Sequence, residues 1–63
     1  MAEIIIGTER ISVEDGVTIG SAMMSLGRYP DTFLYLSNGR PILMTSVLKD
    51  GMTVEALRVA SGG

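Results

Sequence analysis

The sequence has 63 residues, and its 7 acidic and 5 basic side chains give a formal net charge of −2. This length allows one small domain with a marginal core. Neither Cys nor His is present, which excludes disulfides, thiolate zinc sites, a thiol nucleophile and histidine-based catalytic triads. The acidic balance argues against a nucleic-acid partner, because phosphate binding needs a basic face.

Hydrophobic residues make up 46% of the chain, so stability has to come from apolar packing. This share is high for a small domain, and part of it is expected to form a partner surface. The longest apolar run is Ile4–Ile6, which is far too short to span a membrane. The start of the chain lacks the features of a signal peptide. We therefore expect no membrane partner and, by default, a cytoplasmic location.

The first third of the sequence predicts a β-hairpin. Residues 2–7 contain three β-branched Ile residues in a row, which is typical of a central strand buried on both faces. Residues 10–13 alternate polar and apolar side chains, as a half-buried strand does. Gly7-Thr8-Glu9 is a plausible turn between the two strands.

A helix is expected to follow the hairpin. Thr18 is a good N-cap residue, and Ile19, Ala22, Met23 and Leu26 have the spacing of one helical face. Gly27 stands where a left-handed C-terminal cap is favourable. Gly20 lowers the intrinsic stability of this helix, so the helix should depend on packing against a sheet.

Three further strands are predicted in the second half of the chain. They cover residues 32–36, 40–44 and 53–59. Asn38-Gly39 is typical of a tight hairpin turn, because both residues tolerate a positive φ. Pro41 cannot donate a ladder hydrogen bond, which assigns its strand to a sheet edge. Residues 45–48 give no clear signal.

The order of these elements predicts an α+β domain with a mixed sheet of four to five strands and one packed helix. The Ile-rich first strand is a natural centre for the sheet, with the last strand as its parallel neighbour. That is a β-grasp (ubiquitin-like) arrangement. We expect residues 1–59 to form the domain and residues 60–63 a flexible tail.

Two consecutive glycines, Gly62 and Gly63, end the sequence. Because glycine has no Cβ, a diglycine can lie extended in a narrow channel. In this tail the chain resembles the ubiquitin-like sulfur carriers, the group of ThiS and MoaD that includes small archaeal modifier proteins. The matching stretches are Leu48–Gly51, Val54–Ala56 and Arg58–Gly63. The specific parts of the resemblance are the Asp-Gly turn and the tail with its diglycine.

The resemblance implies that this protein is a carrier and not an enzyme. A ThiF/MoeB-like activating enzyme would use ATP and magnesium to adenylate the Gly63 carboxylate, with AMP becoming the leaving group. A sulfur donor would then convert the tail into a thiocarboxylate for an acceptor synthase. The chain itself would bind no cofactor or metal and supply no catalytic side chain. The sulfur acceptor stays open, whether it belongs to cofactor, transfer-RNA or amino-acid biosynthesis.

A docking surface is expected beside the tail. If Val54 and Ala56 face the helix, Leu57 and Val59 lie on the open face of the sheet, where the family meets its partners. The alternatives are a β-bulge or a strand buried on both faces. Arg58 could add a polar contact, and Ala60 and Ser61 complete the predicted partner-binding segment.

Two other functions fit the same residues. A ubiquitin-like modifier would be joined through Gly63 to lysines of target proteins. A β-grasp binding module that is never conjugated would not need the diglycine at all.

Overall fold

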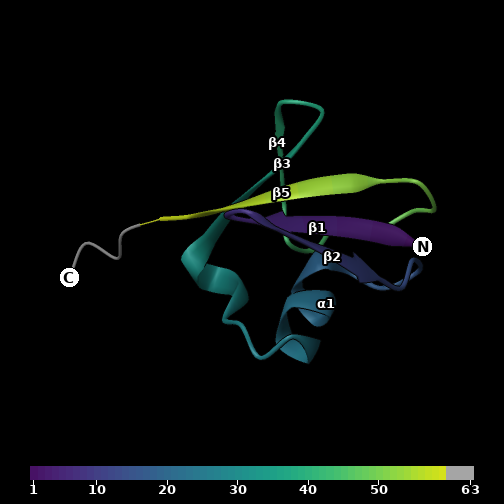
Figure 1. Ribbon diagram of the computed structural model, residues 1–63, viewed down its shortest axis with the longest axis horizontal. Coiled ribbons are helices and arrows are strands. Elements are labelled where there is room, and N and C mark those ends of the chain that lie inside the picture. Colours follow the sequence, from purple (N-terminus) through teal and green to yellow (C-terminus); the bar gives the residue numbers. More distant parts are fainter. Residues whose placement is uncertain (60–63) are drawn as a thin grey trace.

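Five strands form one mixed sheet in the computed structural model of the chain, which describes residues 1–59 (Figure 1). The strand order is β2-β1-β5-β3-β4, in which β1 and β5 are parallel and the other neighbours antiparallel. Helix α1 (Ile19–Ser25) covers one face. The strands are β1 (Ala2–Ile6), β2 (Glu9–Val13), β3 (Phe33–Ser37), β4 (Arg40–Ile42) and β5 (Thr53–Arg58).

The predicted α+β class is confirmed, and this arrangement is consistent with a β-grasp. The Ile-rich first strand lies inside the sheet, between β2 and β5, as the sequence predicts. It is not buried on both faces, however. Ile4 is fully buried towards the helix, whereas Ile5 points to the opposite face and is only half-buried. No element of the described chain covers that second face, because the single helix packs on the first.

Both ends of α1 are capped as the sequence predicts. The Thr18 hydroxyl accepts a hydrogen bond from the backbone N–H of Ser21 at 3.1 Å. At the other end Gly27 has a φ of +75°, and the N–H groups of Gly27 and Arg28 donate to the Met24 and Met23 carbonyls. This pair of bonds is a Schellman motif, which satisfies carbonyls that the last turn leaves without helical partners.

The segment of residues 43–48 leaves the sheet and runs past the start of α1. The predicted strand 40–44 is therefore too long, since β4 ends at Ile42. Beyond it the Met44 carbonyl accepts from the Gly20 N–H at 2.8 Å, and the Ser46 carbonyl accepts from the Ile19 N–H at 3.0 Å. These bonds satisfy two N–H groups that a helix leaves free at its beginning.

A short 3-10 helix, η1 (Pro30–Thr32), precedes β3 and was not predicted. It forms because Pro30 fits the first position of a helical turn and the Thr32 N–H donates to the Tyr29 carbonyl at 3.1 Å. The strand consequently begins at Phe33 rather than Thr32. η1 also supplies the Pro30 carbonyl, which accepts a hydrogen bond from the Tyr35 hydroxyl at 2.7 Å.

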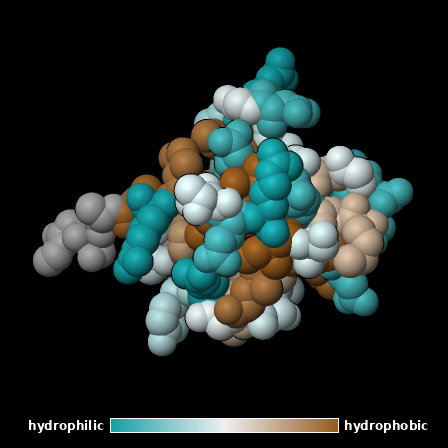
Figure 2. All heavy atoms as spheres, in the orientation of Figure 1, coloured by the Kyte–Doolittle hydropathy of each residue, from teal (hydrophilic) through white to brown (hydrophobic). Residues whose placement is uncertain are grey.

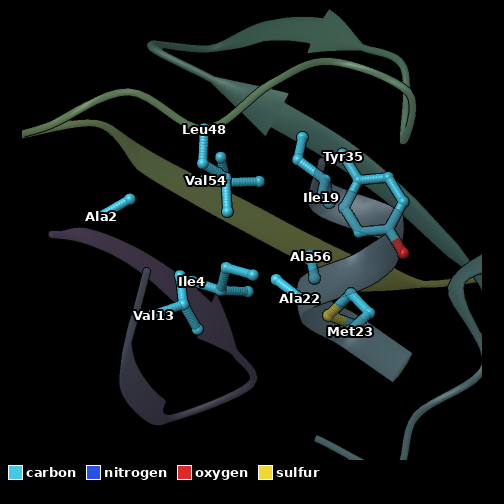
Figure 3. Packing of buried hydrophobic residues seen from close by; sticks show 10 residues of the cluster. All are labelled: Ala2, Ile4, Val13, Ile19, Ala22, Met23, Tyr35, Leu48, Val54 and Ala56. Atoms are coloured by element: carbon cyan, nitrogen blue, oxygen red, sulfur yellow. The ribbon is translucent and has the colours of Figure 1, made fainter. Parts of the chain in front are cut away.

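The core lies between α1 and the covered face of the sheet (Figure 3). Strands β1 and β5 contribute Ile4 and Val54, and the helix contributes Ile19 and Met23, all four with no exposed surface. Leu48, from the segment after β4, closes the same core at 1% exposure. Its buried residues are Ala2, Ile4, Val13, Ile19, Ala22, Met23, Tyr35, Leu48, Val54 and Ala56.

Candidate functional site

Strand β5 carries the residues that lead to the diglycine, and its side chains alternate cleanly. Val54 and Ala56 are buried against the helix side, whereas Glu55 and Leu57 are exposed on the opposite face. The register with β1 and β3 advances one residue at a time. A bulge and burial on both faces, the two alternatives for this strand, are therefore excluded. Leu57 lies on the open face because successive side chains of a strand point to opposite faces, and Val54 and Ala56 occupy the covered one.

Three apolar side chains lie close together on the open face at the end of β5. Leu57 is paired across the strands with Leu34 of β3, and the two are 46% and 48% exposed. Val59, two residues after Leu57, is 44% exposed, and its N–H donates to the Thr32 carbonyl at 3.0 Å. This bond continues the β5–β3 pairing by one residue, which keeps Val59 on the Leu57 side.

We call Leu34, Leu57 and Val59 the apolar patch. In the space-filling view, hydrophobic surface borders the point where the described chain ends (Figure 2). Neighbouring apolar side chains that stay about half exposed in the fold are candidates for a surface that a partner covers. The location of Leu57 and Val59 thus agrees with the prediction, while binding itself is a proposal below.

Arg58 points to the other face of the sheet. It borders an open hollow of about 350 Å³ whose other charged lining residue is Arg28, with apolar lining from Ile6, Phe33, Ala56 and, at its border, Leu57. Arg28 lies 4.0 Å from the Glu9 carboxylate, a weak exposed pair. The predicted partner residues are therefore divided between two faces. Ala60, Ser61, Gly62 and Gly63 lie outside the described residues.

The perturbed titratable groups lie either at the opposite end of β5 or on the covered face of the sheet, apart from the apolar patch. At the opposite end of β5, the N-terminal ammonium donates to Asp50 Oδ1 at 2.6 Å. This hydrogen bond lowers the pKa of the Asp50 carboxyl and raises the pKa of the ammonium. Burial, with a smaller effect from the Asp31 charge, raises the pKa of Tyr35 inside the core. None of these groups is positioned to act on a substrate at the patch.

Two residues of this region were not named as candidates from the sequence. The pairing of Leu34 with Leu57 depends on the register between β3 and β5, which the sequence does not show. Arg28 follows the helix cap and reaches the hollow only because the helix runs towards the same end of the sheet as β5. The sequence shows only that Arg28 follows Gly27, where the predicted helix ends. That alone does not place its side chain at the hollow.

Comparison with protein-family models and with curated proteins finds no match for this chain. Within residues 1–59, no group of three or more His, Cys, Asp or Glu side chains could hold a metal ion. Helix α1, with seven residues, is too short to cross a membrane, and the described chain has no longer helix.

Proposed function

We propose that the chain is a ubiquitin-like sulfur carrier whose Gly63 carboxylate is adenylated and then converted to a thiocarboxylate. The observation that carries the proposal is the end of β5. β5 ends beside the exposed apolar patch, and residues 60–63 follow this end in the sequence, so one partner could bind the patch while its active site receives the tail. The Asp-Gly turn, the final strand and the diglycine, which resemble the ThiS and MoaD group, support the same role.

The chemistry follows from the poor reactivity of a carboxylate. A Gly63 oxygen attacks the α-phosphorus of ATP, pyrophosphate leaves, and the acyl adenylate forms. With hydrosulfide as donor, the sulfur attacks the Gly63 carbonyl carbon, the bond to the AMP oxygen breaks, and the sulfur loses its proton. The product is a thiocarboxylate, whose sulfur is a better nucleophile than the original oxygen. Magnesium and ATP belong to the activating enzyme, and this chain provides the tail and the docking surface.

Leu57 and Leu34 would supply most of the docking energy. Burying exposed apolar surface is worth about 25 cal/mol per Å², and these two side chains are about half exposed. Arg58, on the opposite face, would meet the partner only where the partner reaches around the end of the sheet. The proposed reaction takes place in the cytoplasm, where ATP is available.

ATP–pyrophosphate exchange tests the adenylation step. A ThiF/MoeB-like enzyme from the same host is mixed with the chain, labelled pyrophosphate, ATP and magnesium. We expect label to enter ATP only when the chain is present, and not with a chain that lacks Gly62 and Gly63. Exchange that is absent with the complete chain, or unchanged by the truncation, contradicts the proposal.

The two alternative functions give other results. A protein modifier would give isopeptide bonds between Gly63 and lysines of other proteins, and mass spectrometry of the branched peptides would show them. A binding module that is not conjugated would keep its partner and its phenotype after removal of the diglycine. The sulfur carrier predicts neither result.

A further inference from the structure

The two edges of the sheet differ in how well they are protected against a further strand. Edge strand β4 has three residues, one of which is Pro41. A short strand with proline is a poor template for another strand. Edge strand β2 has five residues and no proline. A five-residue edge without proline can pair with an extended peptide.

The hairpin register shows which backbone groups of β2 face outwards. Ile6 and Glu9 pair across the two-residue turn, and such a pair exchanges both of its hydrogen bonds. Every second pair along the hairpin has the same geometry, so the backbone N–H and C=O groups of Ile11 and Val13 bond to β1. Arg10 and Ser12 direct their N–H and C=O groups away from the sheet. Among residues 1–59 these four groups have no hydrogen-bond partner within the chain.

A groove runs beside this free edge, between β2 and α1, which are neighbours in Figure 1. Its volume is about 270 Å³, and we call it the β2–α1 groove. Its apolar lining comes from Val13, Val17, Ala22 and Leu26, and its polar lining from Ser12, Glu14, Ser21 and Ser25. Side chains of a strand added to β2 alternate in direction, so every second one would lie over this groove.

The charge of the groove indicates what kind of peptide fits. Glu14 is the one charged residue in its lining, and it makes no ion pair with the described residues. The two nearby arginines lie beside carboxylates other than Glu14. Arg10 pairs with Glu3 at 2.9 Å, and Arg28 lies 4.0 Å from Glu9, at the far end of β2. A basic side chain near the end of the peptide that reaches Glu14 therefore complements the groove.

We propose that β2 and the β2–α1 groove bind an extended peptide segment of a partner protein as a sixth strand of the sheet. The backbone of the peptide pairs with Arg10 and Ser12. Small or medium apolar side chains at alternate positions enter the groove, and a Lys or Arg at one end meets Glu14. This site lies on the helix side of the sheet, away from the apolar patch, and does not depend on the sulfur-carrier function.

Panning of a random dodecapeptide phage library against the immobilised chain, followed by NMR on the enriched peptides, tests the proposal. We expect a consensus of alternating apolar residues with one basic residue. In the complex, amide hydrogen exchange should slow at Arg10 and Ser12, because both N–H groups become hydrogen-bonded. Enrichment of no peptide, or protection at other amides with none at Arg10 and Ser12, overturns the proposal.

Substitutions distinguish strand addition from nonspecific apolar binding. Ser12→Pro removes one outward N–H without breaking a bond to β1, and it should weaken binding roughly tenfold, whereas Ser12→Ala should not. Ser25→Arg fills the groove and opposes the basic residue of the peptide, so it should abolish binding. Met24→Arg adds the same charge on the adjacent helix position outside the groove and is the matched control.

Two results of this series contradict the proposal. One is equal loss of affinity for Ser25→Arg and Met24→Arg, which indicates a general charge effect. The other is unchanged affinity for Ser25→Arg, which would place the peptide outside the groove. The Ser25 and Met24 pair decides the question even where Ser12→Pro fails to fold.

Discussion

The two faces of the sheet use similar side chains for opposite purposes. Ile4 on β1 faces the helix and has no exposed surface, whereas Leu57 on the neighbouring strand β5 faces outwards and is 46% exposed. Both are aliphatic residues in central strands. The difference shows that folding free energy is concentrated on the helix side. Apolar residues on the open face add little to it and are available for recognition.

The substitution with the largest expected effect on the free energy of unfolding lies on the covered face of the sheet. Ile4→Ala removes a fully buried side chain and leaves a cavity, which costs about 2–5 kcal/mol. A domain of this size has little stability to spare, so we expect most of the variant to be unfolded at 25 °C. Urea titration followed by circular dichroism measures the change. A loss below about 1 kcal/mol would mean that the helix side is not the main source of stability.

A smaller loss of stability is expected when the hydroxyl of Tyr35, a core residue, is removed. Tyr35→Phe removes the hydrogen bond to the Pro30 carbonyl and should cost about 1 kcal/mol. The same urea titration measures it. Phe33→Leu, a change in a partly buried ring of the same strand, serves as a control for altered packing. A Tyr35→Phe variant as stable as the original chain would show that water replaces the hydroxyl without cost.

On the open face, Leu57→Ala should affect partner binding more than stability. Only about half of the side chain is buried, so the cost in folding free energy should be no more than about 1 kcal/mol. In the activation reaction we expect a raised KM and an unchanged kcat, because a docking contact that is equally strong before and during the chemical step changes binding alone. Met24→Ala, an exposed residue on the helix, is the matched control. An equal KM for both variants would remove the patch from the docking surface.

The smallest effect is expected at the Asp50–ammonium pair, which is fully exposed. The pKa of Asp50 is lowered from its ordinary value of 3.8, so its stabilising contribution is lost as pH falls through the folded-state pKa. The pKa of the ammonium is raised from its ordinary value of 8.0, so its contribution is lost as pH rises through the folded-state value. The pair therefore stabilises the fold between these limits.

Thermal unfolding of the chain and of Asp50→Asn across this pH range measures the contribution. We expect the two melting temperatures to differ slightly near neutral pH and to converge at both extremes. Lys49→Gln, next to Asp50 but outside the pair, serves as the control. Intact mass should first establish that Met1 is retained. A difference that grows towards acidic pH would contradict the assignment of the low pKa to Asp50.

Local signals predicted the fold well because their physical causes lie within a few residues. Thr18 and Gly27 set the helix ends, and Asn38, with a φ of +53°, forms the predicted hairpin turn. Pro41 placed its strand at an edge. These effects act through caps, backbone conformation and missing donors, none of which depends on distant residues.

The parts that could not be predicted depend on contacts between distant segments. The path of residues 43–48 is set by hydrogen bonds to the beginning of α1. The half-buried state of Ile5 follows from its position on the face that α1 does not cover, where no other element of residues 1–59 packs. At the candidate site, alternation along β5 predicted the outward direction of Leu57. Its pairing with Leu34 required the β3–β5 register, and the position of Arg28 at the hollow required the direction of α1.

The decisive measurement of the proposed carrier function is intact-mass analysis of the chain purified from its native host. A sulfur carrier should contain a fraction of molecules in which one oxygen is replaced by sulfur, and fragmentation should locate the exchange at Gly63. Alkylation of the thiocarboxylate should shift this fraction alone. A chain found only with an unmodified Gly63, even when its activating enzyme, ATP and a sulfur donor are supplied, would contradict the carrier function.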